Sequence, residues 1–297
     1  MAAHAVVGPT SHYFVSQRLK LHYVDWGNPH QPLLSLVHGT LDHARSWDWV
    51  ARALRDDFHV VAPDLRGHGD SAWAIGGDYS MLGYVTDLAQ LLSHINQFPA
   101  VLVGHSLGAG VVLQYAGVFP EHVAKLVAIE GLGPTLRRTD DGQRPVHERV
   151  QHWVKQQREL ATRQPRRYKT VDEAVERTRE QHTRLTPEQA RHITVHGLTR
   201  NEDGTYSWKF DNYIRSSRMP YPYHRDDTVG VWSRITAPTL LVNGGESFAA
   251  RGEDDRVSAF PNARSVTIPR ANHWVHHDQM EPFLKALRDF LGVRDGS

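Results

Sequence analysis

The amino-acid sequence predicts an α/β fold whose centre is a doubly wound, mostly parallel β-sheet. Short continuous apolar runs recur along the chain, and segments with helical periodicity separate them. Strands that are apolar throughout suit a parallel sheet that helices cover on both faces, and alternating strands and helices produce that arrangement. The length of 297 residues is enough for one large domain of this kind with an inserted segment.

The expected strands are short apolar runs bounded by turn-forming residues. They lie at 19–26, 33–37, 58–62, 100–103, 126–129, 238–242 and 265–268. The first run alternates apolar and polar side chains and ends at Gly27-Asn28-Pro29, which predicts an antiparallel strand followed by a turn. The helical patterns lie at 46–54, 80–95, 107–118 and 280–291. In such a sheet, ligands bind at the carboxyl ends of the strands.

Between residues 133 and 232 the strand pattern stops, and a polar, charged and mostly helical stretch replaces it. Thr186 followed by Pro187 predicts a helix start, with the threonine as the cap and the proline in the first turn. Residues 201–204 predict a tight turn between two short β-prone pieces. We therefore expect a helical cap at 133–232, inserted between the two parts of the core at 1–132 and 233–297.

The composition narrows the class of protein. The formal net charge is +1 and no long block of Lys and Arg occurs, which argues against a nucleic-acid-binding protein. The sequence predicts no membrane span, and its N-terminus lacks the basic and apolar regions of a secretory signal. The absence of cysteine excludes disulfides, cysteine-ligated metals and a thiol nucleophile. We expect a cytoplasmic enzyme, and the sequence does not decide its oligomeric state.

The most informative motif is Gly104-His105-Ser106-Leu107-Gly108. It follows the apolar run 100–103 and leads directly into a helical pattern, which is the strand–turn–helix context of a nucleophile elbow. The turn holds the serine in a strained conformation and requires residues without clashing side chains two positions before and after it. We therefore expect Ser106 to be a nucleophile at the start of a helix.

A serine hydroxyl is a weak nucleophile and needs an adjacent base. Of the 20 histidines, His273 is the expected base, because it lies between the last strand and the last helix, at the carboxyl edge of the sheet. The expected oxyanion hole consists of the backbone N–H groups of Leu107, directly after the nucleophile, and Thr40, after the strand at 33–37. His276 and His277 do not show a recognised metal-ligand spacing. We expect these two to be exposed at a helix start, and we expect neither a metal nor a cofactor.

These motifs resemble those of the α/β-hydrolase superfamily over nearly the full length of the chain. They comprise the His-Gly pair before Thr40, the turn at 64–71, the elbow and the Asn272-His273 loop. The chain is similar to the capped branch that contains serine hydrolase-like proteins, epoxide hydrolases and haloalkane dehalogenases, which implies an eight-stranded sheet. The latter two groups carry aspartate as the nucleophile, and the epoxide-hydrolase pattern has proline where this chain has Leu41. Both departures imply ester or related acyl chemistry at Ser106.

The acid that would orient His273 is not at its usual place. In most of the superfamily an aspartate follows the seventh strand in a pattern like G-x-x-D, and here Ser247 occupies that position. Glu130 directly follows the run at 126–129, where a charged residue is costly unless it is paired or functional. A subgroup of dehalogenases resembles this arrangement. We expect Glu130 to be the acid, with Glu246 as the alternative.

The expected function is hydrolysis of small or medium carboxylic esters through an acyl-enzyme on Ser106. The same residues would support C–C bond hydrolysis of a diketone-type substrate, and the sequence does not separate the two reactions. A ligand-binding protein without turnover, on a hydrolase scaffold, is a third possibility, because the usual aspartate is missing. His38, Gly39 and Trp274 are expected to contact the substrate. The expected partner is a small molecule, not a nucleic acid or a membrane.

Overall fold

The computed structural model describes residues 8–77, 79–132, 145–216, 225–247 and 255–293. Eight strands form one sheet in the spatial order β1-β2-β4-β3-β5-β6-β9-β10. The strands β1 and β2 pair antiparallel to each other and β2 to β4, whereas the strands from β4 to β10 are parallel. Their bounds are Thr10–Ser16, Leu19–Asp25, Leu33–Val37 and His59–Pro63 for β1 to β4, Ala100–His105 and Val123–Ile129 for β5 and β6, and Thr239–Gly244 and Ala263–Ile268 for β9 and β10.

This arrangement confirms the predicted fold class and the mostly parallel sheet. All the strands expected from apolar runs are present. The strand β1 has mostly exposed side chains and no continuous apolar run, so the hydrophobic pattern does not reveal it.

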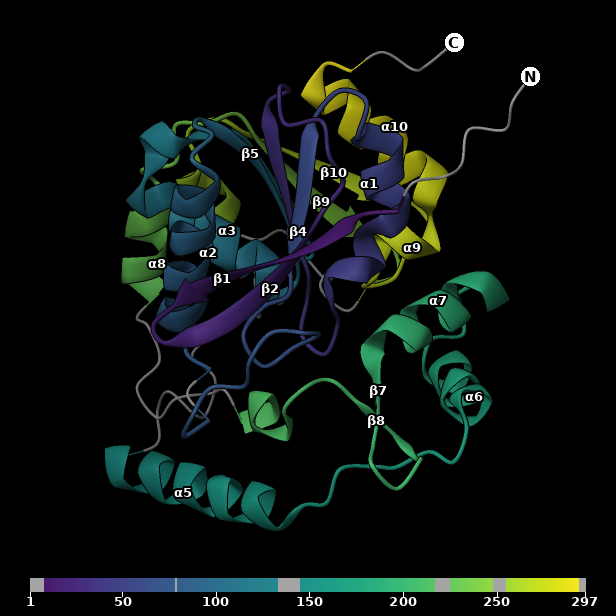
Figure 1. Cartoon of the computed structure of the whole chain (residues 1–297). Helices are drawn as coiled ribbons and strands as arrows, with labels where there is room; N and C mark the ends of the chain where they lie inside the picture. The colour runs from purple at the N-terminus through teal and green to yellow at the C-terminus, as the bar shows by residue number, and fades with distance from the viewer. Residues whose placement is uncertain (1–7, 78, 133–144, 217–224, 248–254, 294–297) are drawn as a thin grey trace, which may run out of the picture.

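Helices cover both faces of the sheet (Figure 1). One face carries α2 (Met81–Ile95), α3 (Leu107–Val118) and α8 (Arg225–Trp232), and the other carries α1 (Asp48–Leu54), α9 (Val275–Asp278) and α10 (Met280–Leu291). Alternate residues of the central strands belong to two different cores: Leu102 packs with the first group of helices, and Val101 and Val103 pack with the second. Because both faces of these strands are buried, their sequences are apolar without interruption.

The segment between β6 and β9 contains most of the predicted cap. Before α8, its described helices and strands are α5 (Val146–Thr162), α6 (Val171–Gln181), α7 (Pro187–Gly197), β7 (Leu198–Arg200), β8 (Tyr206–Trp208) and the short 3₁₀ helix Asn212–Ser216. Thr186 caps α7, and the reciprocal hydrogen bonds with Gln189 of a capping box are both present. β7 and β8 form an antiparallel hairpin in which Gly204 has a φ of +82°. Both local predictions, the helix start and the turn, are therefore confirmed.

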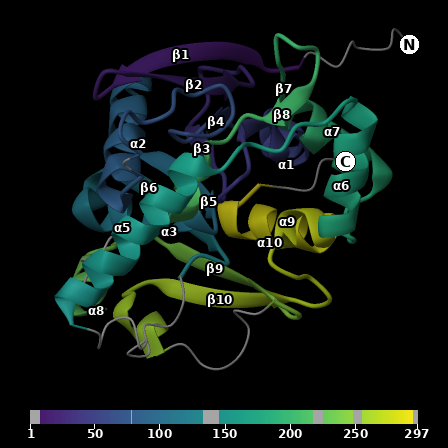
Figure 2. The ribbon, with the colours of Figure 1, turned by 90° about the horizontal axis from the view of Figure 1, so that it is seen from below.

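The limits of the cap stay a prediction. Its expected start at residue 133 falls outside the described residues. At its expected end, α8 packs against α3 of the core, and Trp232 belongs to the buried cluster on that face of the sheet. In Figure 1, α5, α6 and α7 lie below the sheet, and Figure 2, seen from below, shows α5 crossing in front of the central strands.

Candidate active site

The turn between β5 and α3 has the geometry of a nucleophile elbow. Ser106 adopts φ = +52° and ψ = −112°, a conformation that non-glycine residues rarely occupy. A Cβ atom on Gly104 would collide with the backbone of Gly108, and one on Gly108 would collide with the backbone of Val37. The Ser106 N–H donates to the carbonyl of Ile129 at 2.9 Å. The two glycines and this bond hold the serine at the carboxyl end of β5, directly before helix α3.

His273 lies in the loop between β10 and α9, as the sequence predicts. Its Nε2 atom is 3.0 Å from the Ser106 Oγ atom. The backbone of His273 is held on both sides, because its N–H donates to Asn272 Oδ1 at 2.8 Å and its carbonyl accepts from His105 Nε2 at 2.8 Å. His105 follows Gly104 in the elbow, so this last bond joins the serine turn directly to the histidine loop.

Glu130 reaches the other side of the His273 ring. It follows β6 with φ = +53°, and its side chain is fully buried. The Oε1 atom accepts from the Gly244 N–H at 2.6 Å, and the Oε2 atom accepts from the Ser247 hydroxyl at 2.5 Å. The same Oε2 atom lies 3.4 Å from His273 Nδ1, a distance at the long end of hydrogen bonding. The carboxylate is therefore held by two donors and faces the imidazole.

The alternative acid, Glu246, lies elsewhere. Its side chain is 51% exposed and forms an ion pair with Arg184 of the cap, with 2.5 Å between Nη2 and Oε2. Of the two candidate carboxylates, the structure brings only Glu130 to His273. Ser247, which replaces the usual aspartate, donates a hydrogen bond to Glu130 instead.

The expected oxyanion donors belong to Leu107, directly after Ser106, and to the loop of Gly39 and Thr40, which packs against the elbow. Leu107 is the first residue of α3, so its N–H has no acceptor within the helix and the helix dipole adds a partial positive charge there. Gly39 packs directly against the elbow: a Cβ atom on it would lie 2.8 Å from His105 Nδ1 and 3.2 Å from the Ser106 Cβ. This contact places the loop of Gly39 and the exposed Thr40 beside the serine.

The structure contradicts the expectation that His38 contacts the substrate. The side chain is fully buried. Its Nδ1 atom donates to the Gly39 carbonyl at 2.7 Å and its Nε2 atom accepts from the Leu65 N–H at 3.0 Å. Both nitrogens are thus used inside the protein, and burial lowers the pKa of His38. His38 joins the loops that follow β3 and β4.

Trp274 lies between the histidine loop and the cap. Its ring stacks on His182, with 4.3 Å between centroids and an interplanar angle of 5°. It also packs on the apolar cluster of Leu185, Ala190 and Ile193 around α7. Contact between Trp274 and a substrate stays a prediction.

The expectation that His276 and His277 are exposed is wrong. Both are buried, and their ring nitrogens have no hydrogen-bond partner among the described residues. The His276 ring stacks on Trp47 at 4.3 Å between centroids. Burial lowers the pKa of His277 to about 4, lowers that of His276 well below its ordinary value, and does the same to His105. The three rings are therefore neutral at pH 7 and pack behind His273 as aromatic side chains.

The sequence reasoning missed two supports of this site. His105 holds the His273 backbone, and Ser247 holds Glu130. For His105, the signal in the sequence is a polar residue at the second position of the elbow. For Ser247, the signal is a short hydroxyl residue at the position where the expected aspartate is absent.

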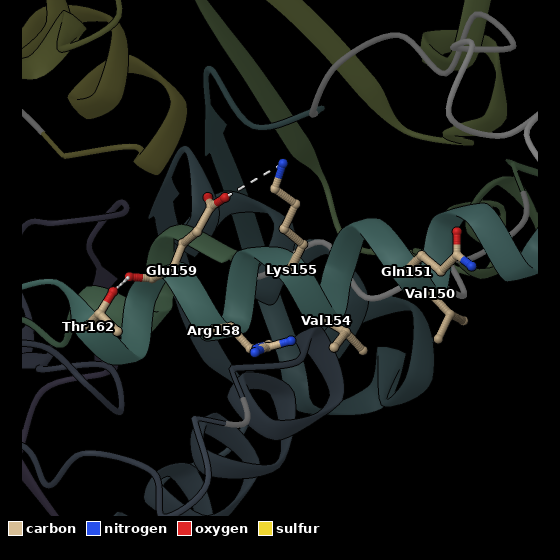
Figure 3. Close-up of a pocket in the computed structure, with 7 residues that line it drawn as sticks. All are labelled: Val150, Gln151, Val154, Lys155, Arg158, Glu159 and Thr162. Carbon is tan, nitrogen blue, oxygen red and sulfur yellow. Dashed lines mark hydrogen bonds and ion pairs between the residues drawn. The ribbon is translucent and has the colours of Figure 1, made fainter.

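A cavity of about 530 Å³ lies along α5. Its described lining includes neither Ser106 nor His273. Figure 3 shows Lys155 and Glu159 extending to one side of this helix and Val150 and Val154 to the other. Lys155 and Glu159 are mostly exposed and lie 4.0 Å apart. Every described residue that lines the cavity belongs to α5, so the cavity is a feature of the cap.

Two groups of described side chains are close enough to share a cation. They are Asp48 with His192 and His196, and His22 with Asp64 and Asp70. Neither group includes Ser106, His273 or Glu130.

Among the described helices, none is both long and apolar enough to cross a membrane.

Comparisons with known proteins agree with this fold. The uncharacterized protein Rv2715 of Mycobacterium tuberculosis (strain ATCC 25618 / H37Rv) is 39% identical over 104 residues, which are 35% of this chain and only 30% of that protein. The esterase YbfF of Escherichia coli (strain K12) is 25% identical over 264 residues, covering 86% of this chain and 91% of YbfF. The solved thioesterase domain from the curacin biosynthetic pathway superposes with a TM-score of 0.82 at 23% identity, covering 95% of this chain and 99% of the domain. The family model of the alpha/beta hydrolase fold matches residues 32–279, and the chain therefore belongs to the α/β-hydrolase fold family.

Proposed function

We propose that this protein is a serine carboxylesterase that hydrolyses small or medium esters through an acyl-enzyme on Ser106. The observation that carries the proposal is the 3.0 Å separation between Ser106 Oγ and His273 Nε2. A serine within hydrogen-bond reach of a base, with the base facing a carboxylate, is the arrangement that activates a hydroxyl for attack on a carbonyl.

In the first half of the reaction, Ser106 Oγ attacks the ester carbonyl carbon and His273 Nε2 accepts the hydroxyl proton. The carbonyl oxygen becomes negatively charged, and we expect the N–H groups of Leu107 and Thr40 to stabilise it. When the tetrahedral intermediate collapses, the C–O bond to the alcohol breaks. His273 returns the proton to the departing alkoxide, which leaves as the alcohol.

In the second half, water replaces the alcohol. His273 removes a proton from the water, the hydroxide attacks the acyl carbon, and the proton returns to Ser106 as the carboxylic acid leaves. Glu130 acts throughout by holding Nδ1–H of His273 and by offsetting the positive charge of the imidazolium. Its own charge is held in place by Gly244 and Ser247.

The relatives support the choice of esters. YbfF, which matches most of this chain, is named as an esterase. Another relative of similar coverage, from Mus musculus, is named as an sn-1-specific diacylglycerol lipase. Both names describe ester hydrolysis, which is the chemistry that the Ser106 arrangement supports.

The test combines turnover with covalent labelling. Purified protein is assayed on p-nitrophenyl esters of increasing acyl length and is treated with a fluorophosphonate, which labels activated serines. We expect ester hydrolysis and labelling of Ser106 alone, and we expect Ser106→Ala to lose both. The exposed serine of α2 provides the matched control, because Ser93→Ala should keep both. Turnover of a diketone without turnover of any ester, or an unlabelled Ser106, would contradict the proposal.

A further inference from the structure

Three side chains with metal-binding atoms meet where the cap touches the core. Asp48 is the first residue of α1 in the core, and His192 and His196 lie one turn apart on α7 of the cap. One potential ligand atom from each residue lies within 4.8 Å of the other two. None of the three belongs to the Ser106 site.

The helix spacing brings the two histidines together. Residues four apart lie on the same face of a helix, and the rings of His192 and His196 are 4.5 Å apart between centroids. Two histidines at this spacing are a common zinc-binding pair. His192 Nε2 lies 3.0 Å from the fully buried carboxylate of Asp48, so the acid from α1 completes a set of two nitrogens and one oxygen.

The positively charged side chain of Arg45 already lies against two of these three residues. Arg45 donates from Nη2 to Asp48 Oδ2 at 2.7 Å and from Nε to Oδ1 at 2.9 Å. Its Nη1 atom is 3.5 Å from His196 Nδ1. The guanidinium therefore contacts Asp48 and His196, the groups that a metal would contact. The side chain of Arg45 is one quarter exposed, so it has a path to solvent.

We propose that Asp48, His192 and His196 form a binding site for a divalent transition metal such as Zn²⁺, which displaces the Arg45 guanidinium. Two imidazoles and one carboxylate are ligands that Zn²⁺, Co²⁺ and Ni²⁺ accept, whereas Mg²⁺ and Ca²⁺ prefer oxygen ligands alone. With three protein ligands, a fourth position is left for water.

The site would connect two parts of the molecule. Asp48 belongs to α1, and both histidines belong to α7, so one bound ion would bridge the core and the cap. A ligand that binds only the folded state stabilises it in proportion to its occupancy. Metal binding should therefore raise the thermal midpoint of unfolding.

The test measures metal binding directly, so its result is independent of ester turnover. The full-length protein is freed of metal and titrated with Co²⁺, whose visible absorption reports coordination by nitrogen and oxygen, and Zn²⁺ is then added as a competitor. We expect one Co²⁺ per chain, displaced by Zn²⁺, and a higher thermal midpoint. His192→Ala/His196→Ala should weaken binding by at least about a hundredfold. The matched control removes two exposed cap histidines, and His147→Ala/His152→Ala should leave the affinity unchanged.

Arg45 distinguishes a metal site from an ordinary ion pair. Arg45→Gln removes the competing positive charge and should tighten Co²⁺ binding, by about tenfold, since a unit charge a few ångströms away opposes the metal. An ordinary ion pair predicts no gain in metal affinity. The proposal is overturned if Arg45→Gln binds Co²⁺ no more tightly than the unmodified protein, or if the double variant at 192 and 196 keeps the original affinity.

Discussion

The elbow region, meaning Ser106, His273, Glu130 and the residues that contact them, differs from the cap in how firmly its residues are held. Around Ser106, two glycines permit close backbone contacts, and hydrogen bonds from His105, Gly244 and Ser247 hold His273 and Glu130. In the cap, α5 has no buried residue, and the apolar clusters around α6 and α7 are small. The proposed reacting groups therefore lie on the tightly packed part of the chain, and the cap above them has far fewer buried residues.

This difference separates two kinds of change. Substitutions in the elbow region should alter the rate of the chemical step, because they move or remove reacting groups. Substitutions in the cap should alter local stability and substrate choice, with smaller effects on the chemistry. The five predictions below run from the largest expected effect to the smallest; four of them test this division, and the one for His277 tests the stability of the core itself.

Ser106→Ala should reduce kcat by at least about 10⁴-fold, since it removes the attacking atom. The fold should be unchanged, because the substitution removes one oxygen from a half-buried position. His273→Ala should cause a comparable loss, and the double variant should be little worse, because the two residues act as a unit. Steady-state kinetics and circular dichroism provide the measurements. A Ser106→Ala protein with half of the original rate would show that another residue attacks.

Glu130→Gln should reduce kcat by about 10²- to 10⁴-fold, because the amide carries no charge and can hold the wrong tautomer of His273. Glu246→Gln is the matched control. Its carboxylate is half exposed and pairs directly with Arg184 on the surface, so we expect a change of less than about threefold. The reverse ranking of the two variants would move the acid to the loop after β9.

The buried histidine cluster should make the core sensitive to acid. The folded-state pKa of His277, about 4, lies below the ordinary value of 6.5 because of burial. The unfolded chain then binds the proton more readily, so stability is lost as the pH falls from about 6.5 toward 4. His277 alone should lower the free energy of unfolding by about 2 kcal/mol between pH 7 and pH 5.

Urea denaturation at pH 7 and pH 5 measures this difference. His277→Leu should make the difference smaller, because it removes the group that titrates. The exposed cap histidine provides the control, and His147→Leu should leave the difference as it is. An equal pH dependence in His277→Leu and the unmodified protein would refute the assignment.

Ser247→Ala should lower kcat by about tenfold, since Glu130 loses one of its two described donors while keeping its charge. Because the Ser247 hydroxyl already reaches Glu130 and the family resemblance implies an acid at this position, Ser247→Asp should restore part of the activity of Glu130→Gln. Ser247→Asp, Glu130→Gln and the double variant that combines them are compared by kcat on one ester. No recovery in the double variant would mean that position 247 does not reach His273.

Thr186→Ala should lower the stability of α7 by about 1 kcal/mol without changing kcat, because it removes the capping hydroxyl from a cap helix. Hydrogen exchange of the α7 amides measures the local effect. Thr186→Ser keeps a hydroxyl at the same position and should behave like the unmodified protein. A loss of kcat as large as that of Ser247→Ala would contradict the proposed division between core and cap.

The sequence by itself determined the features that depend on neighbouring residues. The parallel strands are visible as apolar runs because both faces of each strand are buried. The elbow is visible because the sharp turn at Ser106 requires glycine at 104 and 108. Thr186 and Pro187 identify the start of α7 for the same local reason, since capping involves groups within one turn.

Only the tertiary structure decided which distant groups meet. Glu130 and Glu246 both follow apolar strands, and the choice between them depends on the pairing of β6 with β9, which brings Gly244 and Ser247 to Glu130. The burial of His38, His276 and His277 depends in the same way on the elements that cover them. The exposure and the partners of a side chain depend on segments far away in the sequence, and the spacing of neighbouring residues does not predict them.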